Sequence, residues 1–203
     1  MKESMMWKAQ KDGLLELELV DLREFGSGPR KTVDDTPYGG GDGMLLKPEP
    51  VVAAIEATRS DDSKVVVLTP GGKPFVQSEA ERFSSINHLI LVAGRYEGFD
   101  ERIMDYADEQ VSIGNYVLTG GELPAMSIID ATVRLIPGVL GGENSAAEES
   151  FSDGESIEYP QYTRPPEFRG VRVPDILLTG DHGAIARWRK EQSESKTQQR
   201  KKL

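Results

Sequence analysis

Residues 65–98 have the sequence VVVLTPGGKPFVQSEAERFSSINHLILVAGRYEG, and this stretch decides the fold class. The runs VVVLT (65–69) and LILVA (89–93) are apolar on both faces of a strand, which is typical of parallel strands covered by helices on both sides. A helical pattern over 78–84 separates them. Strands that alternate with helices indicate an α/β fold, so we predict a mostly parallel sheet with helices on both faces.

The chain around this stretch continues the alternation. Prolines open an expected helix at 48–58, and residues 23–43, rich in Gly, Pro and Asp, form a long irregular loop. The other expected strands are a half-buried one over the alternating LELEL of 15–19 and one over 110–113. Helices are expected over 100–107 and from about 122 to 136, where Pro137 closes the helix. After a proline-rich connector, a short helix begins near His182 and runs into the basic tail.

The expected helix at 122–136 is apolar around most of its circumference. Only a narrow polar stripe of Ser127, Asp130 and Arg134 interrupts it. A helix of this kind is buried on most of its sides. In so small a domain, one of those sides belongs either to the interior of the same chain or to a second subunit, and this pattern favours neither.

The composition limits the class of protein. The 203 residues suffice for one substantial domain with a small appendage, and 37% of them are hydrophobic. The absence of cysteine excludes disulfides and thiolate metal sites, and it fits a reducing compartment. No apolar run is long enough for a signal peptide at the N-terminus or for a membrane span. We therefore expect a cytoplasmic protein with no membrane partner.

Charge is distributed unevenly along the chain. The net charge of −10 argues at first against a nucleic-acid partner. Residues 143–158 contain six acids and no base, whereas residues 187–203 contain seven bases against Glu191 and Glu194. A local basic tail contacts phosphates even on an acidic protein, but charge alone favours a solvated, partly disordered terminus.

Three expected strands end in loops that contain glycine: TPGGK (69–73), GRYEG (94–98) and SIGNYVLTGGE (112–122). In open parallel sheets, ligands bind outside the carboxyl ends of the strands, where glycine lets the backbone approach a ligand closely. One such loop is weak evidence, because turns need glycine anyway. Three of them at successive strand ends predict a ligand pocket.

The sequence excludes several kinds of pocket. No GxGxxG follows a strand and no GxxxxGK[ST] is present, so neither a dinucleotide site nor a P-loop is expected. His88 and His182 are far apart and are interpreted as structural residues. No Ser-His-acid arrangement and no cluster of metal ligands stands out, so no metal site is predicted.

Five segments together resemble one known family. They are TVDDTPYGGGDGM (32–44), LTPGGKPF (68–75), LVAGRYEGFDERI (91–103), SIGNYVLTGGELPAMSIIDATVRLIPGVLG (112–141) and YTRPPEFRGVRVPDILLTGDH (162–182). The chain is similar, over about residues 13–189, to TrmD, the bacterial tRNA guanine-N1 methyltransferase family of the knotted (SPOUT) class. The succession of GRYEGFDER and SIGNYVLTGGELPA is highly specific for it.

The resemblance implies a homodimer with a deep C-terminal trefoil knot, in which S-adenosylmethionine binds bent among the three glycine loops. Backbone groups and apolar walls suit the adenine, although core packing is the alternative role of the apolar residues. The family is associated with Mg2+, for which Glu97 and Glu149 are possible ligands, although no spacing demands a metal. The residues implied for cofactor binding are Leu68, Thr69, Pro70, Gly94, Tyr96, Glu97, Ser112, Ile113, Gly114, Tyr116, Leu118, Gly120 and Gly121.

The implied reaction is methylation of N1 of the guanosine immediately 3′ of the tRNA anticodon. Guanine N1 carries a proton, so the site needs a general base and a cation that stabilises charge on the base carbonyl. Arg134 matches the family's arginine in the second role, and its alternative role is a surface ion pair with Asp130. Glu149 stands where the family has an aspartate before Ser-Phe. It is the predicted base, with Asp153 and Glu148 as alternatives.

The resemblance also divides the chain into parts. It implies a knotted methyltransferase domain over 1–160 without the family's first strand, an extended connector over 161–180, and the start of a shortened C-terminal helical tRNA-binding domain over 181–203. This chain differs from the family pattern in having Glu149 in place of an aspartate, in lacking the first strand and in having a shortened C-terminal domain. These differences leave two alternative functions open. One is a non-catalytic dimeric relic that binds RNA or cofactor, and the other is a related knotted methyltransferase that acts on another RNA nucleotide.

Overall fold

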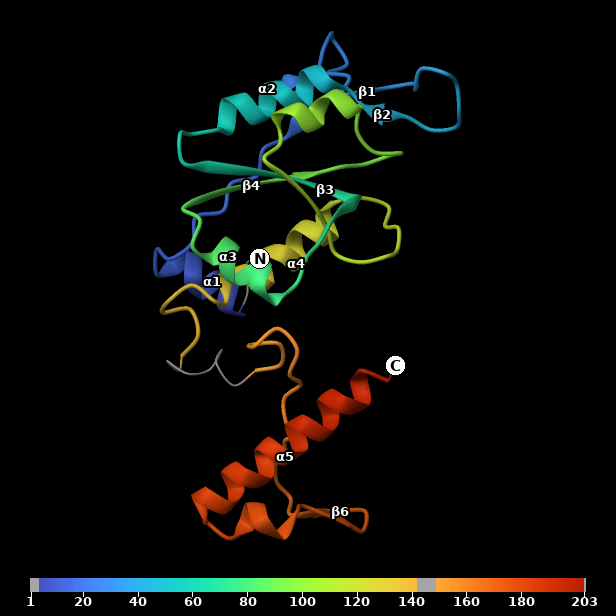
Figure 1. Ribbon diagram of the computed structural model, residues 1–203. Helices are drawn as coiled ribbons and strands as arrows, with labels where there is room; N and C mark the ends of the chain where they lie inside the picture. The colour runs from blue at the N-terminus through green and yellow to red at the C-terminus, as the bar shows by residue number, and fades with distance from the viewer. Residues whose placement is uncertain (1–3, 142–148, 203) are drawn as a thin grey trace. The chain divides into compact units, whose positions relative to one another are not determined.

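The computed structural model describes residues 4–141 and 149–202. The chain divides into two compact units, Met1–Gly141 and Gly142–Leu203. The first unit contains a parallel sheet, and the second is built around one long helix (Figure 1).

A three-stranded parallel sheet forms the centre of the first unit. Its strands are β3 (Ser63–Pro74), β4 (His88–Ala93) and β5 (Glu109–Ser112), in the spatial order β4-β3-β5. Val66 of β3 lies opposite Leu91 of β4 and Glu109 of β5. The predicted α/β fold with a parallel sheet is confirmed, and the parallel direction brings all three carboxyl ends to one edge of the sheet.

Helices cover both faces of this sheet, as predicted (Figure 1). Side chains alternate along β3, so Val65 and Val67 belong to one core and Val66 and Leu68 to the other. The first core is closed by α2 (Pro48–Thr58) and the 3-10 helix η2 (Glu101–Tyr106), and the second by α3 (Gln77–Ser84) and α4 (Glu122–Val133). Burial of these valines and of the helix residues facing them therefore holds the three layers together.

Smaller elements complete the first unit. An N-terminal helix that the sequence patterns did not predict, α1, buries Met6 and Ala9 against Val133 and Val139, beyond the main sheet. The elements are α1 (Ser4–Lys11), the 3-10 helix η1 (Leu22–Phe25) and an antiparallel pair of short strands, β1 (Asp34–Asp35) and β2 (Leu45–Leu46).

The strand expected at residues 15–19 is wrong. These residues belong to no strand. Leu15 and Leu17 are nevertheless half-buried, while Glu16 and Glu18 are exposed. Leu19 is 89% exposed, so only the first two leucines of LELEL are partly buried on one side. A strand also needs a hydrogen-bonded neighbour, which this segment lacks among the described residues.

Three helical predictions need correction. The segment expected as a helix at 100–107 is the 3-10 helix η2, which Asp100 caps by accepting a hydrogen bond from the Arg102 N–H. The helix expected to reach residue 136 ends at Val133. The helix expected to begin near His182 is longer than predicted and includes most of the basic tail, for which charge alone favoured a partly disordered terminus. This helix is α5 (His182–Arg200), whose first turn Asp181 caps by accepting a hydrogen bond from the Ala184 N–H.

The second unit packs an extended segment along α5. The Ile157 N–H donates to the Thr197 hydroxyl at 2.9 Å, and the Ser193 hydroxyl donates to the Ile157 carbonyl at 2.7 Å. Lys201 also pairs with Glu155 at 2.5 Å. The remaining elements are the hairpin β6 (Glu167–Phe168) with β7 (Val171–Arg172) and the 3-10 helix η3 (Asp175–Leu178).

Two negative findings apply to residues 4–141 and 149–202. Within these ranges no helix is both long and apolar enough to cross a membrane. The same ranges contain no group of three or more His, Cys, Asp or Glu side chains placed to hold a metal ion.

The buried hydroxyl of Thr132 on α4 leads to a prediction about stability. This oxygen has no hydrogen-bond partner among the described residues. Valine has the same shape without the polar group, so Thr132→Val is expected to raise the free energy of unfolding by about 1 kcal/mol. Urea denaturation measures the change. Thr58→Val is the matched control, because the Thr58 hydroxyl donates to the Ala54 carbonyl at 2.8 Å. Stabilisation of that variant by the same amount would contradict the prediction.

Candidate functional site

The first loop of the candidate site is a bulge within β3. The pairing of β3 with β5 shifts between Leu68 and Lys73, both of which lie opposite Val111. Residues 69–72 are thus left out of the ladder and protrude from the carboxyl end of the sheet. A side chain at Gly72 would overlap the backbone of Val111. Glycine there lets the protruding loop lie directly against β5.

The second and third loops contact each other through their backbones. The Gly121 N–H donates to the Gly94 carbonyl at 2.7 Å, and Arg95 forms an antiparallel bridge with Gly120. Arg95 also pairs with Glu122 at 2.5 Å. Because β4 and β5 flank β3, the chain that leaves β5 passes across the end of β3 to reach β4. The three strand ends therefore form one continuous site.

The loop after β5 is held in shape by its own polar groups. The buried Ser112 hydroxyl donates to the Gly114 carbonyl at 3.1 Å and accepts from the Gly114 N–H at 3.3 Å. The Phe75 N–H donates to the Ser112 carbonyl at 2.7 Å, which ties the loop to the end of β3. Gly114 has a φ of +156° and lies against the ring of Tyr116. This shape leaves Tyr116 and Leu118 exposed at the surface.

A glycine-rich segment from the long irregular loop joins the site, which the sequence patterns did not predict. The Glu97 N–H donates to the Met44 carbonyl at 3.0 Å, and the Leu46 N–H donates to the Gly98 carbonyl at 2.9 Å. Gly43 has a φ of +85° and packs against the Glu97 side chain. The run GGGDG was a visible signal, but nothing in the sequence said that it would lie beside GRYEG.

The structure brings every predicted cofactor-binding residue to the first unit. Leu68, Thr69 and Pro70 lie at the end of the first run of β3 and in its bulge, Gly94, Tyr96 and Glu97 follow β4, and Ser112, Ile113, Gly114, Tyr116, Leu118, Gly120 and Gly121 lie at the end of β5 and in the loop after it.

The predicted catalytic residues lie in different units. Arg134 follows the last residue of α4 in the first unit, and its N–H donates to the Asp130 carbonyl at 3.4 Å. Glu149 is half-buried and belongs to the second unit. Glu148, one of the alternative bases, lies outside the described residues.

Asp153, the other alternative base, is poorly suited to accept a proton. Its carboxylate accepts hydrogen bonds from the Ser156 hydroxyl, from the Ser156 N–H and from the Glu155 N–H. These bonds lower the pKa of Asp153 to about 2, with the Ser156 hydroxyl as the main cause. A carboxylate with so low a pKa is a weak base at neutral pH, so Asp153 is interpreted as a residue that shapes its own turn.

A network of charged side chains anchors the bulge of β3 to α3. The nearly buried Glu79 carboxylate accepts from Lys73 Nζ at 2.5 Å through one oxygen and from Arg82 through the other. Arg82 continues to Glu109 on β5 with bonds of 2.9 and 2.6 Å. Hydrogen bonds from Lys73 and then from Arg82 hold the pKa of Glu79 below its ordinary value. Lys73 is the first residue after the bulge, so this bond ties the end of the loop to a helix.

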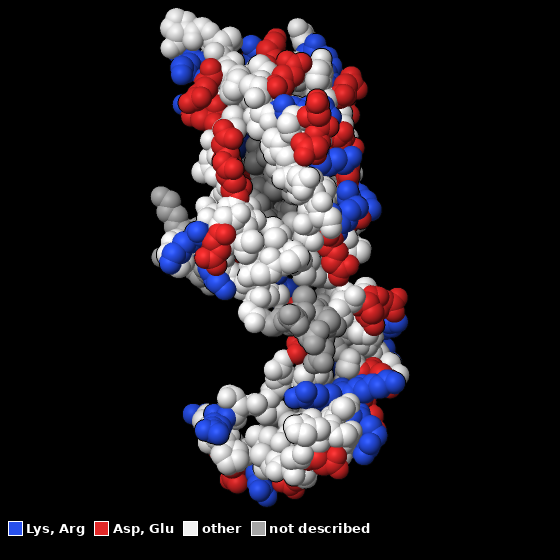
Figure 2. All heavy atoms as spheres, turned by 90° about the vertical axis from the view of Figure 1, so that its left-hand side faces the viewer, with Lys and Arg blue, Asp and Glu red and all other residues white. Residues whose placement is uncertain are grey.

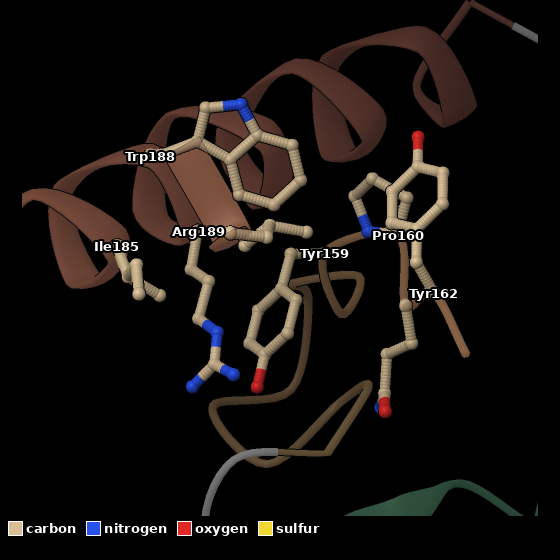
Figure 3. Close-up of a pocket in the computed structure, with 8 residues that line it drawn as sticks. Tyr159, Pro160, Tyr162, Ile185, Trp188 and Arg189 are labelled. Carbon is tan, nitrogen blue, oxygen red and sulfur yellow. The ribbon is translucent and has the colours of Figure 1, made fainter. Parts of the chain in front are cut away.

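The second unit contains a separate pocket of about 200 Å³, called here the aromatic pocket (Figure 3). In the close-up, Tyr159, Pro160 and Tyr162 lie on the extended segment and face Ile185, Trp188 and Arg189 on α5. Side chains of both charges are mixed over this unit, at the bottom of Figure 2, as they are over the sheet unit. The full lining consists of Tyr159, Pro160, Gln161, Tyr162, Leu177, Ile185, Trp188 and Arg189.

Comparison with known proteins identifies the family. The family model described as tRNA (guanine-1)-methyltransferase TrmD matches residues 1–203. The chain belongs to the TrmD family. The prediction of an enzyme from this family is confirmed. The GRYEG and SIGNYVLTGGE segments of this TrmD-family chain are the loops that meet at the carboxyl edge of the sheet.

Three relatives, each named tRNA (guanine-N(1)-)-methyltransferase, illustrate the similarity. The protein of Dictyoglomus turgidum is 53% identical over 194 residues, which cover 96% of this TrmD-family chain and 79% of the relative. A protein of Thermus thermophilus is 51% identical, with 97% of this chain and 82% of the relative covered. The Geobacillus kaustophilus protein is also 51% identical, with the same two coverages.

Proposed function

We propose that this chain transfers a methyl group from S-adenosylmethionine to N1 of the guanosine immediately 3′ of the tRNA anticodon, as a cytoplasmic homodimer. Membership in the TrmD family supports the tRNA substrate and the guanine-N1 chemistry. The observation that supports the site most strongly is the 2.7 Å hydrogen bond from Gly121 to Gly94. It joins the two most specific family motifs at the carboxyl edge of the sheet, where open α/β sheets bind ligands.

The strand ends fit the cofactor. A side chain has no room at either glycine, because at Gly121 it would overlap the backbone of Ala93 and Gly94, and at Gly94 it would overlap the Phe99 ring. Leu68, Ile113 and Leu118 supply apolar walls at this edge, and the exposed backbone groups beside them suit an adenosine. When bound, S-adenosylmethionine supplies a methyl group on a positively charged sulfur. No step is assigned to Mg2+, because no metal-ligand cluster occurs among the described residues.

The proposed chemistry assigns one task to each of two residues. Glu149 takes the proton from guanine N1, and Arg134 stabilises the negative charge that then spreads to the base carbonyl. The N1 electron pair forms a bond to the methyl carbon as the bond between carbon and sulfur breaks. Atoms and charge balance, because Glu149 retains the proton and the sulfur leaves as a neutral thioether.

Exposed apolar side chains near the site support a homodimer. On the first turns of α4, Leu123 is 59% and Met126 is 47% exposed, and Val117 in the preceding loop is 84% exposed. Neighbouring exposed apolar groups of this kind are typical of protein interfaces. We propose that a second copy covers them, that both copies contribute to each site, and that the chain leaving β5 forms the trefoil knot. Of the two roles that the sequence left open for α4, this proposal favours the second subunit.

Methyl transfer to an unmodified tRNA transcript tests the proposal. Labelled S-adenosylmethionine is expected to label a transcript with guanosine 3′ of the anticodon and to leave a transcript with adenosine there unlabelled. Labelling of both transcripts would favour a related enzyme that acts on another nucleotide. Cofactor binding without any labelling would show that this chain is a non-catalytic relic.

Arg134 provides a prediction that separates catalysis from binding. Arg134→Ala is expected to lower kcat by about 100-fold, which is the usual effect of removing one donor that stabilises a developing anion. The dissociation constant for S-adenosylmethionine should change by less than about three-fold, because the ground-state cofactor gains little from this charge. Single-turnover kinetics and calorimetry measure the two quantities. Equal losses in both would contradict the proposed role.

The Lys73–Glu79 bond provides a prediction about the cofactor loop. Glu79→Gln is expected to weaken S-adenosylmethionine binding by about three- to ten-fold, because it releases the end of the bulge. The effect is modest because Lys73 is largely exposed. Glu109→Gln is the control, since it breaks the other arm of the same network and leaves Lys73 bound. Equal weakening in both variants would show that the network acts on stability alone.

The pH dependence of this bond has a defined direction. Because the pKa of Glu79 is lowered in the folded protein, its stabilising contribution is present at neutral pH. The contribution declines as the pH falls through the lowered pKa. The Glu79→Gln variant should therefore lose less cofactor affinity than the parent when the pH is reduced from neutral into the acid range.

A further inference from the structure

We propose that the aromatic pocket of the second unit binds one unstacked base of the RNA substrate. This inference rests on the proposed function, because it takes tRNA as the partner and names a place where the RNA is held. All residues that line the pocket belong to the second unit, and none of them was among the predicted site residues.

The geometry of the pocket suits a flat ring. Ile185, Trp188 and Arg189 are spaced three and four residues apart on α5, so they share one face of the helix. The Tyr162 and Trp188 rings are 6.5 Å apart and inclined at 51°, and the Arg189 guanidinium lies 4.7 Å from the centre of the Tyr159 ring. In Figure 3, Trp188 and Arg189 come from the helix and Tyr159 and Tyr162 from the extended segment, with Arg189 beside Tyr159.

The volume of the pocket limits the kinds of ligand that fit into it. Its volume of about 200 Å³ is below the roughly 300–1,000 Å³ that is usual for a drug-sized ligand or whole cofactor. A single heterocyclic ring system needs less room. Aromatic faces and arginine guanidinium planes are the surfaces on which proteins stack the unpaired bases of RNA loops. The pocket chemistry therefore favours one nucleobase over a complete small-molecule cofactor.

The stretch of chain that holds Trp188 and Arg189 is basic, within a unit whose residues 149–202 carry ten Lys and Arg and nine Asp and Glu. Residues 187–203 contain seven Lys and Arg against Glu191 and Glu194, and Arg187 and Lys190 directly flank the pocket residues of α5. Glu158, the acid next to the pocket on the extended segment, accepts a hydrogen bond from Gln161. A base in the pocket would thus leave its phosphates beside a basic helix, where electrostatic attraction adds to stacking.

The second unit also offers a matched control. Arg169 lies over the ring of Phe168 at 5.2 Å, and this arginine–aromatic pair belongs to the hairpin and does not line the pocket. Tyr159→Leu and Trp188→Leu are expected to weaken tRNA binding by about ten-fold each, because stacking on one aromatic side chain corresponds to roughly 5- to 150-fold in affinity. Phe168→Leu should change it by less than about two-fold. An equal loss in all three variants would overturn the proposal.

Abasic RNA distinguishes a base pocket from a general loss of structure. Removing the base at one loop position of the tRNA should weaken binding to the parent protein. For the tRNA that lacks this base, and for no other abasic tRNA, Tyr159→Leu should weaken binding little further. A structural defect would instead weaken every abasic RNA by the same factor. If no position shows this dependence while the parent binds tRNA normally, the pocket does not hold a base. If the parent binds no tRNA, the proposed function itself fails.

Fluorescence provides a measurement that leaves the pocket intact. The chain has two tryptophans, so Trp7→Phe makes Trp188 the only one. Saturable quenching of Trp188 by a single-stranded RNA heptamer, with no quenching by a duplex of the same composition, is the expected result. Identical responses to both RNAs, or no response to either, would overturn the proposal.

Discussion

Replacing Glu149 by glutamine is expected to lower kcat by about 100-fold or more, because general bases contribute roughly 10²- to 10⁴-fold to the rate. Glutamine has nearly the same shape and cannot accept the N1 proton, so binding of tRNA and cofactor should persist. Rapid-quench measurement of methyl transfer at saturating substrates isolates the chemical step. Circular dichroism and cofactor titration establish that the variant is folded.

Two further variants make this expectation specific. Glu149→Asp should retain or raise activity, since it restores the residue that the resembled family has at this position. Asp153→Asn removes a nearby carboxylate that three hydrogen bonds already occupy, so it should leave the chemical step nearly unchanged. An unchanged rate in Glu149→Gln together with a large loss in Asp153→Asn would transfer the role of base to Asp153.

Gly121→Ala is expected to abolish measurable S-adenosylmethionine binding. An alanine Cβ here would lie 2.7 Å from Ala93 Cα and from the Gly94 nitrogen, which are backbone atoms of the last residue of β4 and of the residue after it. To relieve the overlap, the hydrogen bond between Gly121 and Gly94 must lengthen and the loop must leave the sheet. We expect a loss of about 1–3 kcal/mol in the free energy of unfolding, as for other overpacked sites.

Gly71→Ala is the matched control for this variant. Gly71 belongs to the bulge of the same site, and a Cβ there meets no atom within 4 Å. Its stability should change by less than about 0.5 kcal/mol, which is typical of a surface substitution. Calorimetric titration with S-adenosylmethionine and urea denaturation compare the two variants. Normal cofactor binding by Gly121→Ala would show that the loop after β5 does not form the cofactor site.

Much of the fold was predictable from local pattern. The strands β3 and β4 contain the apolar runs 65–68 and 89–93, which are typical of parallel strands buried between two helical layers. Prolines at the start of α2 also indicated where that helix begins. The prediction failed at LELEL, because alternation specifies which side of a segment is buried and cannot specify whether a second strand lies beside it.

In the candidate site, too, features encoded by neighbouring residues were predicted, and contacts between residues far apart in the chain were not. Glycine at successive strand ends predicted where the ligand site lies, and the family motifs predicted which residues belong to it. The Lys73–Glu79 bond, the approach of Gly43 to Glu97 and the aromatic pocket were not predicted. Each of them joins residues whose meeting depends on how helices and loops pack, and no sequence spacing encodes that distance.

The sequence by itself determined the α/β class, the parallel direction of the strands, the three glycine loops and membership in the TrmD family. These features follow from side-chain polarity at short range and from motifs of contiguous residues. Only the tertiary structure decided that β3 lies between β4 and β5, so that SIGNYVLTGGE passes across its end and bonds to Gly94. The order of the strands depends on how the two hydrophobic cores pack against the opposite faces of the sheet. The residues of each core come from distant parts of the chain, so no local pattern specifies this packing.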